Sequence, residues 1–175
     1  IPSVVYGLFG MAIVAPFIQE MFNLSTGLNL FNTSVILGLM VVPIIASMSE
    51  DALSNIPNNL KEASLALGAT KWQTIIRVVI PAARSGITGS ILHGFGRAIG
   101  ETMVVLMVAG GSAQIPGSIF DSIRPLTSTI AAEMGETVVG DLHYRSLFAI
   151  AIVLFVITFI VNLAAQLSAA KRRNQ

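Results

Sequence analysis

Charge is scarce in this chain. Only 11% of its 175 residues are Asp, Glu, Lys or Arg, whereas 54% are hydrophobic. Soluble domains carry about 25% charged residues. So few ionised groups cannot cover a water-facing surface of this size, and we therefore expect most of the chain to lie in membrane lipid. Ten Lys and Arg against nine Asp and Glu leave no broad basic surface, which argues against nucleic-acid binding.

Four stretches are apolar enough to form transmembrane helices, which need about 20 mainly apolar residues. They are residues 4–22, 33–48, 85–110 and 147–167. The second is the weakest, because it is short and is interrupted by Pro43. The sequence therefore predicts an all-α, polytopic membrane helical bundle with about four spans, in one domain over residues 1–175.

The chain starts inside a span-like pattern, with no initiator Met and no charged flank before Val4. This start fits neither a signal peptide nor a transit peptide. We interpret the chain as the C-terminal part of a longer protein whose earlier helices are missing here.

Basic residues are distributed unevenly between the segments that join the spans. Residues 50–84 contain four Lys or Arg and the C-terminal tail contains three, whereas residues 111–146 contain two and residues 23–32 none. Lys and Arg concentrate on the cytoplasmic side of membrane proteins. We therefore expect residues 50–84 and the C-terminus in the cytoplasm, and the other two segments outside.

The sequence pattern of residues 50–84 predicts a helical hairpin. Asn59 and Glu62 have capping-box spacing, and Gly68 can end a helix in the left-handed conformation. A second helical stretch over residues 72–79 should end at Pro81. Four apolar residues of this stretch share one side: Trp72, Ile75, Ile76 and Val79. Such an apolar face suits insertion into a groove of a partner protein.

Two short motifs in this hairpin have a defined spacing. Glu62-Ala63-Ser64 is followed by Gly68 four residues after Ser64, and later by Val78-Val79-Ile80-Pro81. This pattern resembles the EAA loop of ABC-importer permeases. The resemblance implies that Glu62, Ala63, Ser64, Gly68 and Pro81 belong to a coupling helix that docks on a separate ATP-hydrolysing subunit. The alternative is an interfacial amphipathic hairpin without a partner.

Motifs of catalysis are missing from the sequence. There is no Gly-x-x-x-x-Gly-Lys-Ser/Thr run, no His-Glu-x-x-His pattern, no Gly-x-Ser-x-Gly elbow and no cysteine. We therefore expect no catalytic residue, no metal site and no cofactor on this chain. If ATP drives the protein, ATP and Mg²⁺ are expected on a partner subunit.

Three polar residues interrupt the third span at intervals of four: His93, Arg97 and Glu101. On a helix they would share one face. An Arg at mid-membrane costs at least about 2.5–3.5 kcal/mol on insertion scales, so it should face protein or a wet cavity. Glu101 can pair with Arg97, and an entering tetrahedral oxyanion would compete for the guanidinium. An ion pair that only fixes packing is the alternative, and for His93 packing is the favoured interpretation.

The run Gly96-Arg97-Ala98-Ile99-Gly100-Glu101-Thr102, at this distance after the EAA-like loop, resembles the phosphate-specific ABC permeases. Two further segments are similar to the PstC type of that group. They are residues 1–7 and, in the outer segment, Arg124-Pro125-Leu126-Thr127 with Ala131-Ala132-Glu133.

This resemblance implies import of inorganic phosphate across a prokaryotic plasma (inner) membrane, with Arg97, Glu101 and Thr102 on the substrate path. It also implies three protein partners: an ATP-binding cassette subunit, a second, PstA-like permease subunit and an extracytoplasmic phosphate-binding protein. A permease for sulfate or molybdate and an ion-coupled secondary transporter remain as alternatives.

The outer segment, residues 111–146, divides into two parts. Residues 112–125 are rich in turn-forming residues, and residues 126–134 have a helical pattern. A helix there can cap the pathway or meet a substrate-binding protein, and a surface helix without a partner is the equal alternative. Glu133 and Glu136 are expected to be solvated carboxylates.

Overall fold

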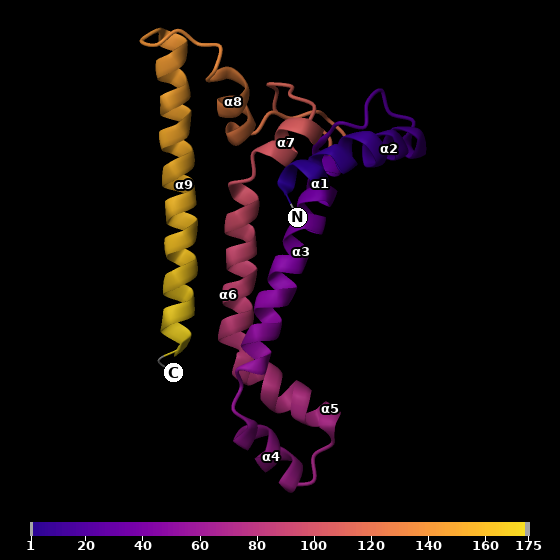
Figure 1. Cartoon of the computed structure of the whole chain (residues 1–175), viewed down its shortest axis with the longest axis vertical. Coiled ribbons are helices and arrows are strands. Elements are labelled where there is room, and N and C mark those ends of the chain that lie inside the picture. The colour runs from indigo at the N-terminus through magenta and orange to yellow at the C-terminus, as the bar shows by residue number, and fades with distance from the viewer. Residues whose placement is uncertain (1, 174–175) are drawn as a thin grey trace. The chain divides into compact units, whose positions relative to one another are not determined.

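The computed structural model describes the chain from residue 2 to residue 173, with side chains as far as residue 163. Within these residues every named element is a helix (Figure 1). The only pairing of extended backbone among them is an isolated bridge between Gly110 and Ile123. The all-α prediction is therefore confirmed. Contacts divide the chain into two compact units. The first contains residues up to 40 and residues 97–159, and the second contains residues 41–96 and those from 160 onward.

Four helical stretches of the described chain are long and apolar enough to cross a membrane, as predicted. The first contains α1 (Ser3–Phe9), the π-helical turn η1 (Gly10–Val14) and α2 (Ala15–Phe22), and the second is α3 (Leu30–Ser54). The third contains α5 (Lys71–Thr74), the π-helical turn η2 (Ile75–Val79) and α6 (Ile80–Ile99), and the fourth lies in α9 (Leu142–Arg173). The shorter helices are α4 (Asn58–Ala66), α7 (Met103–Val108) and α8 (Leu126–Glu133).

The second span is longer than the sequence predicted, because α3 continues through Pro43 to Ser54. Proline removes one backbone hydrogen bond from a helix. In an apolar environment every other backbone group still needs a partner inside the helix, so losing one bond is cheaper than ending the helix. The predicted interruption at Pro43 is therefore wrong.

Pro81 also fails to end its helix, contrary to prediction. A π-helical turn precedes it, and the Ile80 N–H donates to the carbonyl of Ile75, five residues earlier. The first span repeats this arrangement: η1 ends two residues before Pro16. A proline ring collides with the carbonyl four residues before it, and a widened turn relieves that collision. One helical run therefore extends from Lys71 to Ile99.

The third span ends at Ile99, so the prediction of one continuous helix over residues 85–110 is wrong. Residues 100–102 are not helical, and α7 then begins at Met103. The Glu101 carboxylate binds both Arg97 and the Val104 N–H, which lie on either side of the break. Glycine at position 100 weakens the helix there, and these two contacts hold the chain in the broken conformation.

The first unit is built around α7, which packs on α1, on η1 and on α8. Gly10 lies against Ile36 and Val108 so closely that any side chain would overlap them. The side-chain amide of Asn32 donates to the Gly10 carbonyl at 3.2 Å. The buried apolar residues of this unit are Ala15, Ile18, Ile36, Met40, Val104, Val105, Val108, Ala109 and Leu147.

The segment after α7 is ordered by contacts with the start of α3. The Leu30 N–H donates to the Asp121 carbonyl at 3.0 Å, and the Phe31 N–H donates to the Ile119 carbonyl at 2.8 Å. Backbone carbonyls thereby satisfy free N–H groups of the first turn of α3. The helix predicted over residues 126–134 is confirmed as α8, which ends at Glu133.

In the second unit, the later part of α3 lies against α6. A side-chain carbon at Gly86 would lie 2.5 Å from the Ala52 side chain, and one at Gly94 would lie 2.5 Å from Ile45. These glycines therefore permit close helix packing, which is the usual role of small residues in membrane helices.

Candidate functional site

Residues 58–79 form a helical hairpin, and its turn is fixed by backbone hydrogen bonds. Gly68 follows α4 with φ of +82°, in the left-handed region. Its N–H donates to the Leu65 carbonyl at 2.9 Å, and the Ala69 N–H donates to the Ser64 carbonyl at 3.2 Å. These two bonds form a Schellman motif, which ends a helix and sets the direction of the following chain. The role predicted for Gly68 as a helix stop is confirmed.

The capping box lies at a different place from the one predicted. Asn59 does not cap α4, because the helix begins one residue before it, and its side chain accepts from the Leu60 N–H. The Glu62 side chain is exposed on α4. The capping box instead opens α5: the Gln73 N–H donates to the Thr70 hydroxyl, and the Thr70 N–H donates to the Gln73 side chain.

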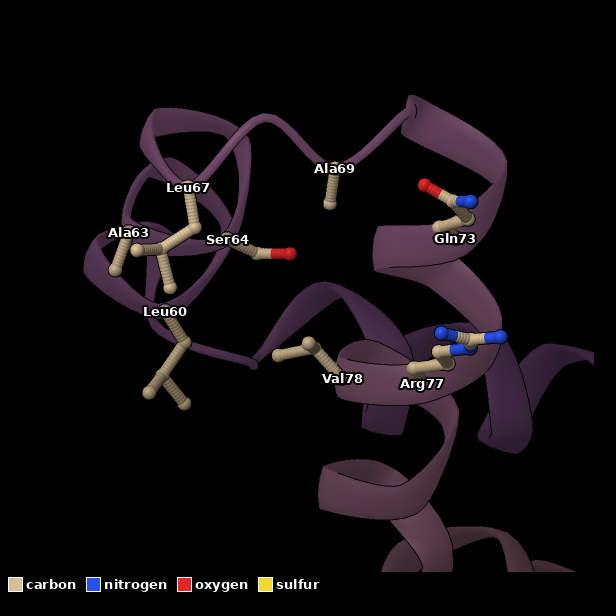
Figure 2. A pocket seen from close by; sticks show the side chains of 8 residues that line it. All are labelled: Leu60, Ala63, Ser64, Leu67, Ala69, Gln73, Arg77 and Val78. Atoms are coloured by element: carbon tan, nitrogen blue, oxygen red, sulfur yellow. The ribbon is translucent and has the colours of Figure 1, made fainter.

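A hydroxyl pair joins the two arms of the hairpin. Ser64 Oγ on α4 lies 3.0 Å from Thr74 Oγ1 on α5. Thr74 is buried, although its neighbours on α5 are exposed. Figure 2 shows the Ser64 hydroxyl pointing from α4 toward the second arm. Ser64, which stands where the EAA pattern has its second alanine, therefore links the two arms.

Between the arms lies an open hollow of about 340 Å³. Side chains from both arms and from the turn line it (Figure 2): Leu60, Ala63, Ser64, Leu67, Ala69, Gln73, Arg77 and Val78. Leu67 at its edge is 90% exposed and Trp72 is 69% exposed. Of the apolar residues predicted to share one side of residues 72–79, Trp72, Ile75 and Ile76 are exposed and Val79 is buried.

The break between α6 and α7 holds an ion pair. Arg97 Nη1 lies 2.8 Å from Glu101 Oε2, and the two side chains are 46% and 3% exposed. The prediction that both residues lie on one helix face is wrong, because Glu101 follows the end of α6. The contact forms nevertheless, since the chain leaves the helix only two residues before Glu101.

Thr102 and His93, which the sequence also singled out, lie close to this ion pair in the sequence. The Thr102 hydroxyl donates to the Gly100 carbonyl at 3.3 Å, and Thr102 precedes the first residue of α7 without capping it. His93, for which packing was the favoured interpretation, is exposed on α6.

The structure adds one contact to this break that the sequence did not reveal. The Thr127 hydroxyl on α8 donates to the Glu101 carbonyl at 3.0 Å. A threonine two residues after a proline predicts only the first turn of a helix. No local pattern could therefore have connected it to a residue 26 positions earlier.

Glu133 at the end of α8 is not the solvated carboxylate that the sequence predicted. Its Oε1 accepts from Arg124 Nη1, and its Oε2 lies 3.1 Å from His143 Nε2. Arg124 also donates from Nε to the Gly111 carbonyl. The carboxylate thus joins the segment before α8 to the first turn of α9. Among the described residues, no three His, Asp or Glu side chains gather in a way that could hold a metal ion.

Comparison with known proteins gives a consistent family. The sequence model described as "Binding-protein-dependent transport system inner membrane component" matches residues 1–174. The probable ABC transporter permease protein YqgH of Bacillus subtilis is 38% identical over 99% of this chain and 56% of its own length. The phosphate transport system permease protein PstC of Mesorhizobium japonicum is 39% identical over 92% of this chain and 55% of its own length. PstC of Haemophilus influenzae is 35% identical over 98% of this chain and 60% of its own length.

The chain thus spans a little over half the length of these curated relatives. A solved structure of the MetNI methionine ABC transporter, in inward-facing conformations, matches 98% of this chain and 68% of its own chain. The TM-score is 0.70 at 23% sequence identity, so the likeness shows a shared fold.

Proposed function

The chain belongs to the family of inner membrane components of binding-protein-dependent transport systems, and on that premise we propose that it is a permease subunit of an ATP-driven importer of inorganic phosphate. Several relatives that match nearly the whole chain are described as phosphate transport permeases. In this proposal the chain forms part of the translocation path and hydrolyses no ATP itself. ATP and Mg²⁺ bind to a partner subunit of the ATP-binding cassette class.

The observation that carries the proposal is the Arg97–Glu101 pair at the break after α6. Glu101 is buried, whereas nearly half of the Arg97 side chain is exposed. A guanidinium presents several N–H donors in a planar fork that fits a tetrahedral oxyanion. A phosphate ion can therefore approach Arg97 and compete with Glu101 for it. Thr102, in the same break, completes the proposed path.

The cytoplasmic hairpin is the proposed contact with the ATPase. Its exposed apolar residues around the hollow suit a groove in that partner. We assign this contact to the EAA-like positions: Glu62, Ala63, Ser64, Gly68 and Pro81. One helical run begins with the second arm of the hairpin at Lys71 and ends at Ile99, two residues beyond Arg97. ATP-driven movement of the hairpin can thus reach the ion pair through one helical run, as part of a two-state change of access.

Orientation and partners follow from this assignment. The hairpin and the C-terminus face the cytoplasm; the side chains of the basic tail, residues 171–173, lie outside those described. Residues 111–146 then face the opposite side, where an extracytoplasmic phosphate-binding protein would dock. A second, PstA-like permease subunit would complete the path in lipid.

The test is transport by the purified complete transporter in vesicles, with its ATPase and binding protein. We expect ATP-dependent uptake of labelled phosphate, and little uptake of sulfate or molybdate. Arg97→Ala should lower phosphate uptake by roughly tenfold or more, because a charge-assisted hydrogen bond contributes about 1.5–3 kcal/mol. Arg84→Ala, an exposed arginine on the same helix, is the matched control.

Two results would contradict the proposal. Uptake driven by an ion gradient without ATP would identify a secondary transporter. Preference for sulfate or molybdate would keep the permease assignment and change the substrate.

A further inference from the structure

Glu101 has all of its polar groups bonded within the protein. Its N–H donates to the Ala98 carbonyl at 3.2 Å, and its carbonyl accepts from the Thr127 hydroxyl at 3.0 Å. Its two carboxylate oxygens accept from the Val104 N–H and from Arg97. Three of these partners lie within four residues of Glu101 in the sequence. The fourth, Thr127, is the one that comes from a different part of the chain.

Thr127 is unlike the hydroxyl residues beside it on α8. Ser128 and Thr129 both donate to the Pro125 carbonyl, inside their own helical turn. Thr127 is only 8% exposed, and its hydroxyl leaves α8 to reach the break between α6 and α7. A threonine hydroxyl in the first turn of a helix commonly bonds nearby backbone, so this contact depends on the packing of α7 against α8.

We propose that Thr127 is a positioning residue for the Arg97–Glu101 pair. By holding the Glu101 carbonyl, it fixes the non-helical residues 100–102 and keeps the Glu101 carboxylate directed at Arg97. The helix α8 thereby sets how strongly Glu101 competes with an anion for the guanidinium. This inference rests on the proposed function, in which Arg97 binds phosphate.

The direction of the effect follows from this competition. Without the Thr127 hydroxyl, the Glu101 carbonyl loses its partner and residues 100–102 are less constrained. Glu101 then competes less well for Arg97, so a bound phosphate is held more tightly and is released more slowly. Loss of Thr127 should therefore increase phosphate affinity and decrease maximal uptake. A general loss of folding would decrease both.

The experiment uses the complete transporter with Thr127→Val, which removes the hydroxyl at nearly constant volume. Equilibrium binding of labelled inorganic phosphate is measured on the complex without the binding protein, and uptake is measured in vesicles. We expect Thr127→Val to bind phosphate roughly threefold to tenfold more tightly and to lower maximal uptake by a similar factor, the size of one neutral hydrogen bond. Thr127→Ser should restore both values. Thr129→Val is the matched control, because its hydroxyl bonds within α8.

Two further measurements make the outcome decisive. In an Arg97→Ala background, Thr127→Val should change phosphate binding no further, because the proposed effect passes through Arg97. Hydrogen exchange at the Val104 amide should be faster in Thr127→Val and normal in Thr127→Ser. Equal effects of Thr127→Val and Thr129→Val, or unchanged exchange at Val104, would overturn the inference. If the wild-type complex binds no phosphate, the proposed function fails, while the exchange measurement still decides whether Thr127 holds the break.

Discussion

Arg97 and Glu101 form one ion pair but lie in different surroundings. The Glu101 carboxylate is buried and accepts from Arg97 and from the Val104 N–H, whereas the Arg97 side chain is nearly half exposed. A buried charge whose partner is removed is costly, because nothing replaces the lost contact. The protein therefore keeps the anion of the pair fixed and leaves the cation accessible, which is the arrangement that an anion-binding site needs.

Replacing Arg97 with lysine separates charge from shape at this position. Arg97→Lys keeps the positive charge but loses the planar fork that matches an oxyanion in a bidentate way. We expect phosphate binding to weaken roughly threefold, which is less than the tenfold or greater loss expected for Arg97→Ala. Equilibrium binding of labelled phosphate to the transporter complex without its binding protein measures this. Arg84→Lys, on an exposed part of α6, should bind like the wild type. If Arg97→Lys also binds like the wild type, the shape of the guanidinium has no role.

At the scale of secondary-structure elements, three structural features stabilise the hairpin of residues 58–79. These are the Schellman turn at Gly68, the capping box of Thr70 and Gln73, and the hydroxyl pair of Ser64 and Thr74. Each is local or joins neighbouring arms, and each leaves the apolar side chains around the hollow exposed. The hairpin is thus rigid in its backbone and open on its surface.

The hydroxyl pair between the arms can be tested by a double-mutant cycle. Ser64→Ala and Thr74→Val each remove one partner, and a buried Thr74 hydroxyl left alone should destabilise the hairpin by about 1 kcal/mol. We expect each variant to lower the phosphate transported per ATP hydrolysed, because a looser hairpin transmits movement less well. The double variant should be no worse than the single variants. Additive losses would show that the two residues act separately.

The turn itself makes a second prediction at this scale. Gly68→Ala places a side chain at a φ of +82°, which costs roughly 1–2 kcal/mol in the left-handed conformation. The turn should distort and binding of the ATPase subunit should weaken, as measured by co-purification at increasing salt or detergent. Gly89→Ala is the control. A side-chain carbon added at Gly68 or at Gly89 meets open space, but Gly89 lies within the helix α6. Gly89→Ala should be neutral or stabilising by about 0.5–1 kcal/mol. Equal weakening in both variants would contradict this account of the turn.

At the scale of the whole molecule, two compact units share long helices, and each unit has a distinct task in the proposed mechanism. The second unit carries the hairpin, and the first carries the ion pair and the segment around α8. Within the first unit, Glu133 joins the loop before α8 to the start of α9 through Arg124 and His143. This carboxylate therefore connects three segments that are separate in the sequence.

Glu133→Gln should loosen this connection. The neutral amide loses the charge-assisted contact with Arg124, and because these side chains are partly exposed we expect only about 0.5–1 kcal/mol of local destabilisation. Hydrogen exchange should become faster in residues 111–125 and in the first turn of α9. Glu136→Gln, an exposed carboxylate three residues later, is the matched control and should leave exchange unchanged. Unchanged exchange in Glu133→Gln would show that the contact contributes nothing.

The composition and periodicity of the chain predict much of the fold. Apolar length alone gave the four spans, since a helix is the structure that satisfies its backbone within lipid. The spacing of residues predicted the helix stop at Gly68 and the short helix after Pro125. It also predicted that Arg97 and Glu101 lie close enough to form an ion pair. All of these depend on residues close together in the sequence, where backbone geometry permits few alternatives.

Packing decided what local patterns could not. The helix continues through Pro43 because the loss of one backbone hydrogen bond is tolerated. It continues through Pro81 because a π-helical turn makes room for the proline ring. The span that reads as continuous to residue 110 breaks at Gly100, where Glu101 finds partners on both sides and Thr127 arrives from α8. Hydrogen bonds between distant residues carry no periodic signal, since they depend on which helices meet. The surroundings of the ion pair therefore followed from the folded chain, although the pair itself could be read from its spacing.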